Sequence, residues 1–159
     1  MSQPEEPTTL LDPAILRATA ALLATQTAIG RLIETEAVAP AGLDPTIADL
    51  MVRLDQAPGS RLRAVDLSRQ LLLSPSHISR TIDRAEAAGL VSRAPDPDDR
   101  RAAQVKMTPA GHAALADFAP RLTGLLRRVV HQTLSADEID LLVGLLDRLE
   151  AAARQPRAH

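Results

Sequence analysis

The sequence has no cysteine, tryptophan or tyrosine, and Phe118 is its only aromatic residue. The lack of cysteine excludes disulfide bonds, thiol-based redox sensing and cysteine-ligated zinc. Because the composition is 45% hydrophobic but 1% aromatic, Leu, Ala, Ile and Val must build the core. The same scarcity argues against a ligand pocket that works by aromatic stacking and favours an aliphatic cleft.

Targeting and membrane segments are also missing. The first residues, MSQPEEPTT, are acidic and contain proline, without the basic start and apolar run of a signal peptide, and no apolar run reaches membrane-spanning length. We therefore expect a cytoplasmic protein. Residues 1–11 are expected to form a disordered arm and residues 155–159 a frayed tail.

No catalytic or metal-binding set is recognisable. His77, His112, His131 and His159 are scattered, without the HxH or HxxxH spacing of metal ligands, so no metal or cofactor is indicated. His77 follows Ser76, but adjacent helical residues project in different directions and no carboxylate is placed to orient the histidine. The sequence therefore indicates a protein that is not an enzyme.

The most informative stretch is SPSHISRTIDRAEAAG, residues 74–89. Ser74 followed by Pro75 is typical of a helix N-terminus, and Gly89 is typical of the position just after a helix. The spacing predicts a helix with a narrow apolar stripe and an opposite polar face. The stripe consists of Ile78, Ile82 and Ala85, and the polar face carries Ser76, His77, Arg80 and Arg84.

The neighbouring residues extend this helix into a larger motif. A second short helix is predicted over residues 64–71, and two short helices joined by a tight turn form a helix-turn-helix. Strands are predicted at residues 90–93 and 103–107, joined by a tip rich in Pro and Asp, with a brief strand at 61–63. The helix before the turn is expected to bury Val65, Leu67 and Leu71, with Leu72 and Leu73 filling the turn. Together these elements predict a winged helix-turn-helix over residues 44–108.

Long aliphatic helices flank this unit. Helices are predicted from Asp12-Pro13 to about Thr35, from Asp44-Pro45 to about Asp55, and from Thr108-Pro109 to about Leu134. A kink is expected near Pro120. Ser135 and Glu138 form a capping box for a last helix. The sequence thus predicts a mainly α fold with a small β-hairpin wing. Residues 12–37 and 109–154 carry more apolar surface than the helices of one chain can bury. We therefore expect two copies of the chain to form a homodimer through these residues.

Charge is distributed unevenly along the chain. The formal net charge is −2, yet residues 61–106 carry nine basic and six acidic side chains, which leaves that segment positive. The rest of the chain is correspondingly acidic. Positive charge is therefore concentrated on the predicted winged helix-turn-helix, as expected for a surface that binds DNA.

The segments DLSRQLLLSPSHISRTIDRAEAAGLVSR and DPDDRRAAQVKMTPAGHAAL resemble MarR-type transcriptional regulators, named for multiple antibiotic resistance. The serine-rich helix start, the Gly-Leu exit, the Asp-x-Arg wing and the Thr-x-x-Gly helix start occur together. One departure is Ala85, where the family commonly has leucine. The resemblance implies a homodimeric regulator, with repression as the default, that binds a palindromic operator in double-stranded DNA. It also implies release by a small lipophilic or acidic effector held between the dimer helices and the DNA-binding lobes.

Specific contacts follow from how a helix enters the major groove. Its N-terminal residues lie nearest the bases, so the candidates for base contact are Ser76, His77, Ser79 and Arg80. Ser74 and the free N–H groups of the first turn are candidates for a phosphate. Arg84 is a candidate for a phosphate or for bracing the wing; the alternative is a surface ion pair with Asp83 or a wing acid.

The wing carries its own candidates. Asp96, Asp98 and Asp99 are expected to face a phosphate backbone, which requires a local reason. The resemblance implies that Arg101 enters the minor groove, that Asp99 supports it and that Arg100 holds a phosphate. The alternative is that Pro95, Asp96 and Pro97 only form a turn and the arginines are solvated. A different class of function, a winged-helix protein-interaction module that has lost DNA binding, is disfavoured because Ser76, Arg80 and Arg101 are intact.

Overall fold

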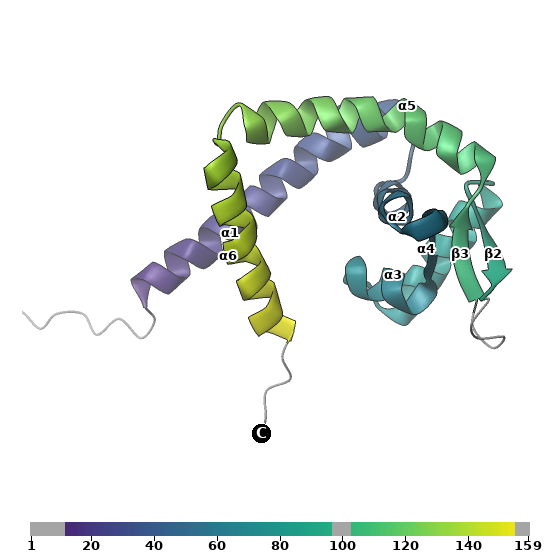
Figure 1. Cartoon of the computed structure of the whole chain (residues 1–159), viewed down its shortest axis with the longest axis horizontal. Coiled ribbons are helices and arrows are strands. Elements are labelled where there is room, and N and C mark those ends of the chain that lie inside the picture. Colours follow the sequence, from purple (N-terminus) through teal and green to yellow (C-terminus); the bar gives the residue numbers. More distant parts are fainter. Residues whose placement is uncertain (1–11, 97–102, 155–159) are drawn as a thin grey trace, which may run out of the picture.

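A computed structural model of the chain describes residues 12–96 and 103–154 (Figure 1). The fold is mostly helical, with one small antiparallel sheet. The helices are α1 (Pro13–Ile33), α2 (Pro45–Gln56), α3 (Ala64–Gln70), α4 (Pro75–Ala87), α5 (Pro109–Leu126) and α6 (Ala136–Arg154). The strands are β1 (Arg61–Arg63), β2 (Val91–Pro95) and β3 (Ala103–Met107). This architecture confirms the predicted winged helix-turn-helix with flanking helices.

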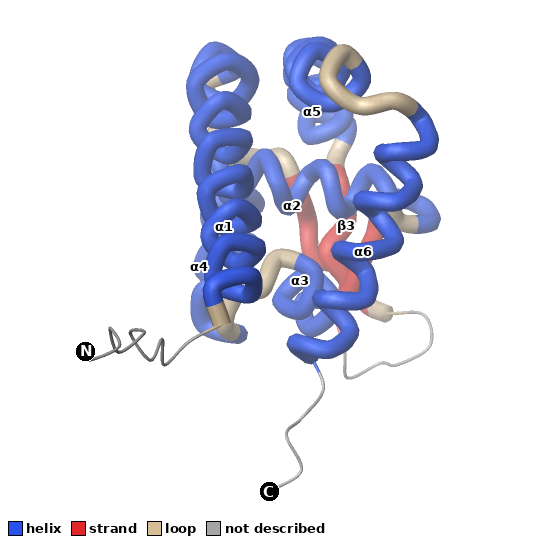
Figure 2. The backbone as a smooth tube through the Cα atoms, turned by 90° about the vertical axis from the view of Figure 1, so that its left-hand side faces the viewer, coloured by secondary structure: helices blue, strands red, loops and turns tan. Residues whose placement is uncertain are grey.

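The elements divide into a lobe and three long helices. The lobe contains α2, α3, α4 and the sheet, while α5 passes from the sheet across to α1 (Figure 1). Short turns complete the chain: η1 (Glu34–Val38) and η4 (Arg127–His131) are π-helical turns that continue α1 and α5, and η2 (Ala39–Ala41) and η3 (Pro58–Ser60) are 3-10 turns. Helices α1 and α6 cross in the projection of Figure 1 but stand apart in Figure 2.

The described part of the chain has one main core, and it lies inside the lobe. Helices α2, α3 and α4, the sheet and α5 contribute to it. Its largest fully buried apolar side chains are Phe118, Leu50, Met51, Leu54, Leu67, Ile82, Met107, Val91 and Val105. Phe118 of α5 is 1% exposed within this core, so its packing links α5 to the lobe.

The sheet has the order β1-β3-β2, with both pairings antiparallel. Leu62 of β1 and Arg93 of β2 both pair with Val105 of the central strand. The short strand predicted at residues 61–63 is thus confirmed as the third strand. It anchors the wing hairpin to the segment that enters α3.

Four helices begin with the same two-residue pattern, a capping side chain followed by proline. Asp12, Asp44, Ser74 and Thr108 each accept hydrogen bonds from backbone N–H groups of the first turn. The Ser135–Glu138 capping box is also present, with the Ser135 N–H 2.8 Å from the Glu138 carboxylate. That hydrogen bond lowers the pKa of Glu138, so the stabilising contact persists above its ordinary pKa and is lost only as pH falls through the lowered value.

Two apolar side chains of the helix-turn-helix are not where the sequence placed them. Val65 is 52% exposed and Leu72 is 80% exposed. Val65 lies on the outer side of α3, and Leu72 has a left-handed backbone (φ 54°) that directs its side chain away from the core. Leu71 and Leu73 instead pack against the core. Further along, α5 continues through Pro120 as one helix, and the kink expected near this proline stays a prediction.

Candidate nucleic-acid interface

Helix α4 presents its polar edge to solvent. Ile78, Ile82 and Ala85 are at most 2% exposed, which confirms the predicted apolar stripe. Thr81 is buried as well, and its hydroxyl has no hydrogen-bond partner among the described residues. The predicted base-contacting side chains are all exposed: Ser76, His77, Ser79 and Arg80. The fold therefore leaves the candidate reading edge uncovered.

The start of α4 has the features of an anion-binding helix terminus. The Ser74 hydroxyl accepts the N–H of His77 at 3.3 Å and lies 3.2 Å from the hydroxyl of Ser76. The first turn of a helix carries a partial positive charge and free N–H groups. Ser74 is exposed, so a phosphate can approach this end of the helix without displacing another part of the described chain.

Arg80 is distinguished from neighbouring arginines by the absence of an ion pair within residues 12–96 and 103–154. Arg69 pairs with Asp66, and Arg84 pairs with Asp44. An exposed guanidinium with no carboxylate partner keeps all its donors available for a ligand. Arg80 is therefore the side chain of α4 best prepared to bind the edge of a base or a phosphate.

Arg84 takes a partner that the sequence did not indicate. Its Nη2 lies 2.6 Å from Oδ2 of Asp44, whose other carboxylate oxygen caps the first turn of α2. The contact ties the second half of α4 to the start of α2. It differs from both partners considered from the sequence, Asp83 and a wing acid, because Asp44 is brought to α4 only by tertiary packing.

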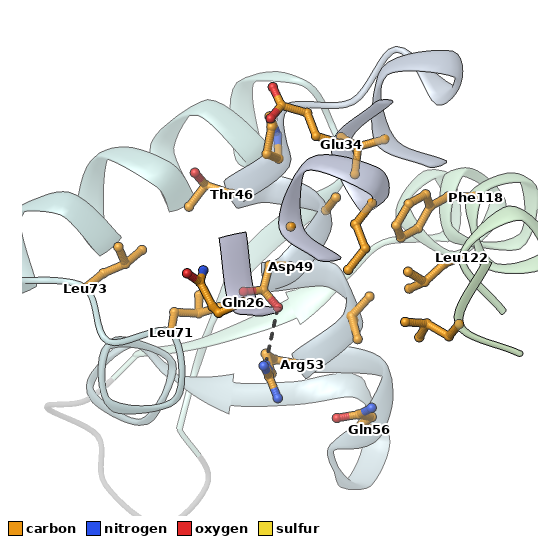
Figure 3. Close-up of a pocket in the computed structure, with 17 residues that line it drawn as sticks. Gln26, Glu34, Thr46, Asp49, Arg53, Gln56, Leu71, Leu73, Phe118 and Leu122 are labelled. Carbon is orange, nitrogen blue, oxygen red and sulfur yellow. Dashed lines mark ion pairs between the residues drawn. The ribbon is translucent and has the colours of Figure 1, made fainter. Parts of the chain in front are cut away.

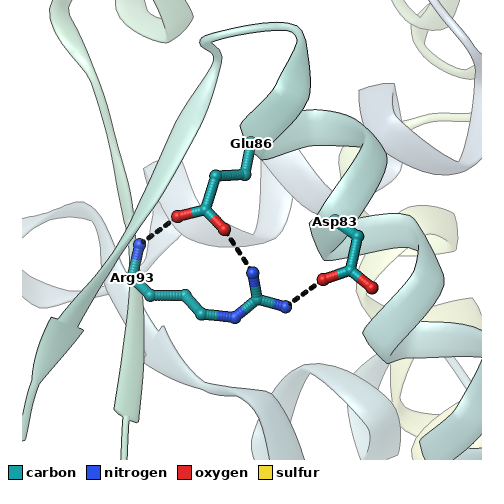
Figure 4. Close-up of polar contacts among 3 residues, drawn as sticks. All are labelled: Asp83, Glu86 and Arg93. Atoms are coloured by element: carbon teal, nitrogen blue, oxygen red, sulfur yellow. Dashed lines mark hydrogen bonds and ion pairs between the residues drawn. The ribbon is translucent and has the colours of Figure 1, made fainter.

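Asp83 forms an ion pair with an arginine of the wing hairpin. Arg93, on β2, contacts both Asp83 and Glu86 (Figure 4). The hydrogen bond to Asp83 raises the pKa of Arg93 above its ordinary value, so its charge is permanent at every accessible pH. Two acids spaced one helical turn apart precede a strand that carries an arginine, but this spacing does not identify the pairing, because helix and strand are brought together only by tertiary packing.

The expectation that Asp96 faces a phosphate backbone is wrong. The residue is 2% exposed, and its Oδ2 lies 2.5 Å from Nε of Arg63 on β1. The carboxylate is thus turned toward the protein, where it holds the wing hairpin to the third strand. Asp98, Asp99, Arg100 and Arg101 lie outside the described residues, as do the predicted arm and tail.

Other kinds of site receive no support from the part of the chain that the structure describes. There, no group of three His, Asp or Glu side chains is placed to hold a metal ion. None of the described helices is both long and apolar enough to cross a membrane.

The sequence and the fold of this chain are similar to those of proteins of one family. A model of the MarR family matches residues 41–102. The multiple antibiotic resistance protein MarR of Escherichia coli (strain K12) is 32% identical over 108 residues, which cover 67% of this chain and 74% of that protein. AbsC, a MarR family transcriptional regulator from Streptomyces coelicolor, superposes with a TM-score of 0.81 at 26% identity and covers 92% of this chain and 99% of its own.

A second solved structure was determined with nucleic acid. It is Sco3205, a MarR family transcriptional regulator from Streptomyces coelicolor in complex with DNA, with a TM-score of 0.78, 24% identity, and coverage of 92% of this chain and 95% of its own. The fold and exposed helix define a winged helix-turn-helix protein. The chain belongs to the MarR family of transcriptional regulators.

Proposed function

We propose that the protein is a cytoplasmic, homodimeric repressor that binds a palindromic operator through α4 and is released by a small-molecule effector. The observation that carries this proposal is the uncovered polar edge of α4, where Arg80 has no ion-pair partner among the described residues. The DNA complex of Sco3205, a protein of the same fold, supports it. In this arrangement two α4 helices enter successive major grooves about one helical turn apart.

The proposed DNA-binding side chains fall into two groups, those that contact bases and those that contact phosphates. Arginine can donate two hydrogen bonds to O6 and N7 of guanine, and this is the role we propose for Arg80. Ser76, His77 and Ser79 lie on the same N-terminal portion and complete the base contacts. Ser74 and the first-turn N–H groups hold a phosphate. For the wing we propose the roles implied by the family: Arg101 in the minor groove, supported by Asp99, with Arg100 on a phosphate.

Replacing Arg80 with alanine tests the reading role. Arg80→Ala should cost about 1–3 kcal/mol of binding free energy and relax the preference at one base pair in each half-site, because a bidentate contact is lost. Arg101→Ala should instead weaken binding to all sequences alike. Fluorescence anisotropy on an operator and on its single-base variants measures both effects. Arg61→Ala, which removes an exposed arginine of β1 that has no role in the proposed contacts, is the control. Unchanged affinity and preference in Arg80→Ala would show that another face reads the DNA.

A second copy of the chain is the occupant that we propose for the apolar surfaces of α1 and α6. No residue of either helix is buried. Exposed side chains include Ile15 and Leu23 on α1, at 65% and 63%, and Leu141 and Leu149 on α6, at 64% and 54%. Helices of this length derive most of their stability from packing of an apolar face. Their exposure in one chain is consistent with burial against another, and it supports residues 12–37 and 109–154 as the dimerisation region.

A cavity between the dimerisation helices and the lobe is a candidate effector site. Its volume is about 660 Å³, and α1, α2, α5 and the helix-turn-helix turn line it (Figure 3). Leu71, Leu73, Phe118 and Leu122 provide apolar walls. Arg53 and Asp49 form an ion pair on α2 with Nε and Oδ1 3.4 Å apart, and the buried Nε of Arg53 makes no hydrogen bond within the described chain. The lining also carries Glu34, so among the described residues Arg53, whose Nε has no hydrogen-bond partner there, is the one cationic donor in the cavity for the carboxylate of a lipophilic acid.

Release of DNA by such acids is testable directly. Octanoate and benzoate, titrated into the protein–DNA complex, should lower the affinity for DNA, since binding in this cavity favours a different spacing of the two lobes. Arg53→Leu should raise the concentration needed for half-release by about tenfold through loss of a charged hydrogen bond. Equal release of the wild-type and Arg53→Leu complexes would show that the acids act elsewhere.

An electrophoretic mobility shift experiment distinguishes the DNA-binding regulator from the alternative class of function, a protein-interaction module without DNA binding. The probe is DNA from upstream of the coding region. A DNA-binding regulator gives a shifted complex that weakens steeply with salt, because phosphate contacts release counterions. Absence of any complex at low salt would favour the interaction module.

A further inference from the structure

A single arginine of the wing connects β2 to the DNA-reading helix. Asp83 and Glu86 lie on the side of α4 that faces the strand, and Arg93 places its guanidinium between them (Figure 4). Nη2 of Arg93 lies 2.5 Å from Oδ1 of Asp83, and Nη1 donates to Oε2 of Glu86. The backbone N–H of Arg93 donates to Oε1 of Glu86 at 3.0 Å. We call these three residues the Arg93 clamp.

The contacts of the clamp restrict orientation more than they stabilise the fold. A planar guanidinium holds two carboxylates in a fixed geometry, and the main-chain bond to Glu86 opposes sliding of the strand along the helix. The three side chains are 36% to 59% exposed, and exposed ion pairs contribute little to stability. Directly after the last residue of β2, Asp96 forms an ion pair with Arg63 of β1. The strand is therefore held at two points, one on α4 and one on the sheet.

The charges of the clamp also bear on DNA binding. Asp83 and Glu86 lie on the helix that we propose enters the major groove, where unpaired carboxylates would repel phosphates. Arg93 pairs with both acids, and its guanidinium is thereby directed at the helix rather than outward (Figure 4). The residue is well placed to arrange other groups and poorly placed to bind DNA itself.

We propose that Arg93 is a positioning residue for DNA binding, which sets the angle between α4 and the β2–β3 hairpin by holding Asp83 and Glu86. The inference rests on the proposed function. This angle determines whether α4 can lie in the major groove while the hairpin reaches the adjacent minor groove. Arg93 acts through the two acids and makes no direct contact with the nucleic acid.

The experiment uses a DNA fragment that the wild-type protein shifts in a gel. Arg93→Met removes the guanidinium, and Asp83→Ala with Glu86→Ala removes both acceptors while keeping strong helix formers in α4. Simple electrostatics predicts that deleting two acids from a DNA-binding helix tightens binding. The clamp predicts the opposite: each variant should lose about tenfold in affinity, and the triple variant should lose no more than Arg93→Met alone.

Controls separate orientation from folding. Thermal unfolding should be close to wild type for all clamp variants, and Asp55→Ala, which removes an exposed acid of α2 outside the clamp and outside the proposed dimerisation region, should leave DNA affinity unchanged. Wild-type-like or tighter binding by the Asp83→Ala, Glu86→Ala variant would overturn the proposal, as would losses that add in the triple variant. Failure of the wild-type protein to bind DNA would instead overturn the proposed function.

Discussion

Replacing Gly111 with alanine is expected to destabilise the protein by about 3 kcal/mol, at the upper end of the cost of overpacking. A Cβ atom at this position would lie 2.1 Å from the backbone carbonyl oxygen of Leu90 and 2.7 Å from Cγ of Met107. The first turn of α5 rests directly on the chain that leaves α4: the Thr108 hydroxyl donates to the Gly89 carbonyl at 2.6 Å. Since the obstructing atom belongs to the backbone, relief requires α5 to move away from the sheet.

Gly124 supplies the matched control on the same helix. Apart from its chain neighbours and the backbone of its own helix, no atom of the described chain lies within 4 Å of a Cβ built at Gly124, so Gly124→Ala should stabilise the protein by about 0.5–1 kcal/mol through helix propensity. Urea unfolding monitored by circular dichroism measures both variants. A Gly111→Ala protein as stable as wild type would show that α5 does not pack on the Leu90 backbone as described.

Charges placed on the apolar face of α6 are expected to separate the dimer and abolish tight operator binding. Leu142 and Leu146 lie four residues apart on one face of the helix and are 41% and 39% exposed in the single chain. In a dimer, Leu142→Glu with Leu146→Glu would bury two unpaired carboxylates. Because two linked recognition helices bind more tightly than one, apparent affinity for a two-half-site operator should fall by about a hundredfold or more.

Light scattering coupled to gel filtration gives the mass, and anisotropy gives the affinity. Ala151→Glu, which adds a charge on the opposite face of α6, should remain dimeric and bind DNA as wild type does. A Leu142→Glu, Leu146→Glu protein that still has the mass of a dimer would place the interface elsewhere.

Local rules predicted much of this fold from the sequence. The capping residues before Pro13, Pro45, Pro75 and Pro109 mark real helix starts, because a cap needs only its own first turn. The stripe of α4 follows equally directly from helical periodicity. Residues 103–107 form a strand as predicted.

Features that depend on tertiary placement were missed. Leu72 was predicted to fill the turn because it is apolar. The turn instead holds its backbone in the left-handed conformation, which a leucine rarely adopts, and its side chain is exposed. Arg84 binds Asp44, Arg93 binds Asp83, and Asp96 binds Arg63, and each pairing joins separate elements. Charge patterning within one helix indicates i, i+3 and i, i+4 partners and contains no information about which distant acid packing will bring near.

The central claim is that two copies of α4, held at a fixed separation by the terminal helices, read one DNA duplex. Its most direct measurement is a hydroxyl-radical footprint of the wild-type protein on a DNA sequence selected from a random pool, with the binding stoichiometry determined in parallel. The account predicts two symmetry-related protected regions whose centres lie about 10 base pairs apart, with two chains per duplex. Protection of a single region by one chain, or a pool in which no sequence is enriched, would contradict it.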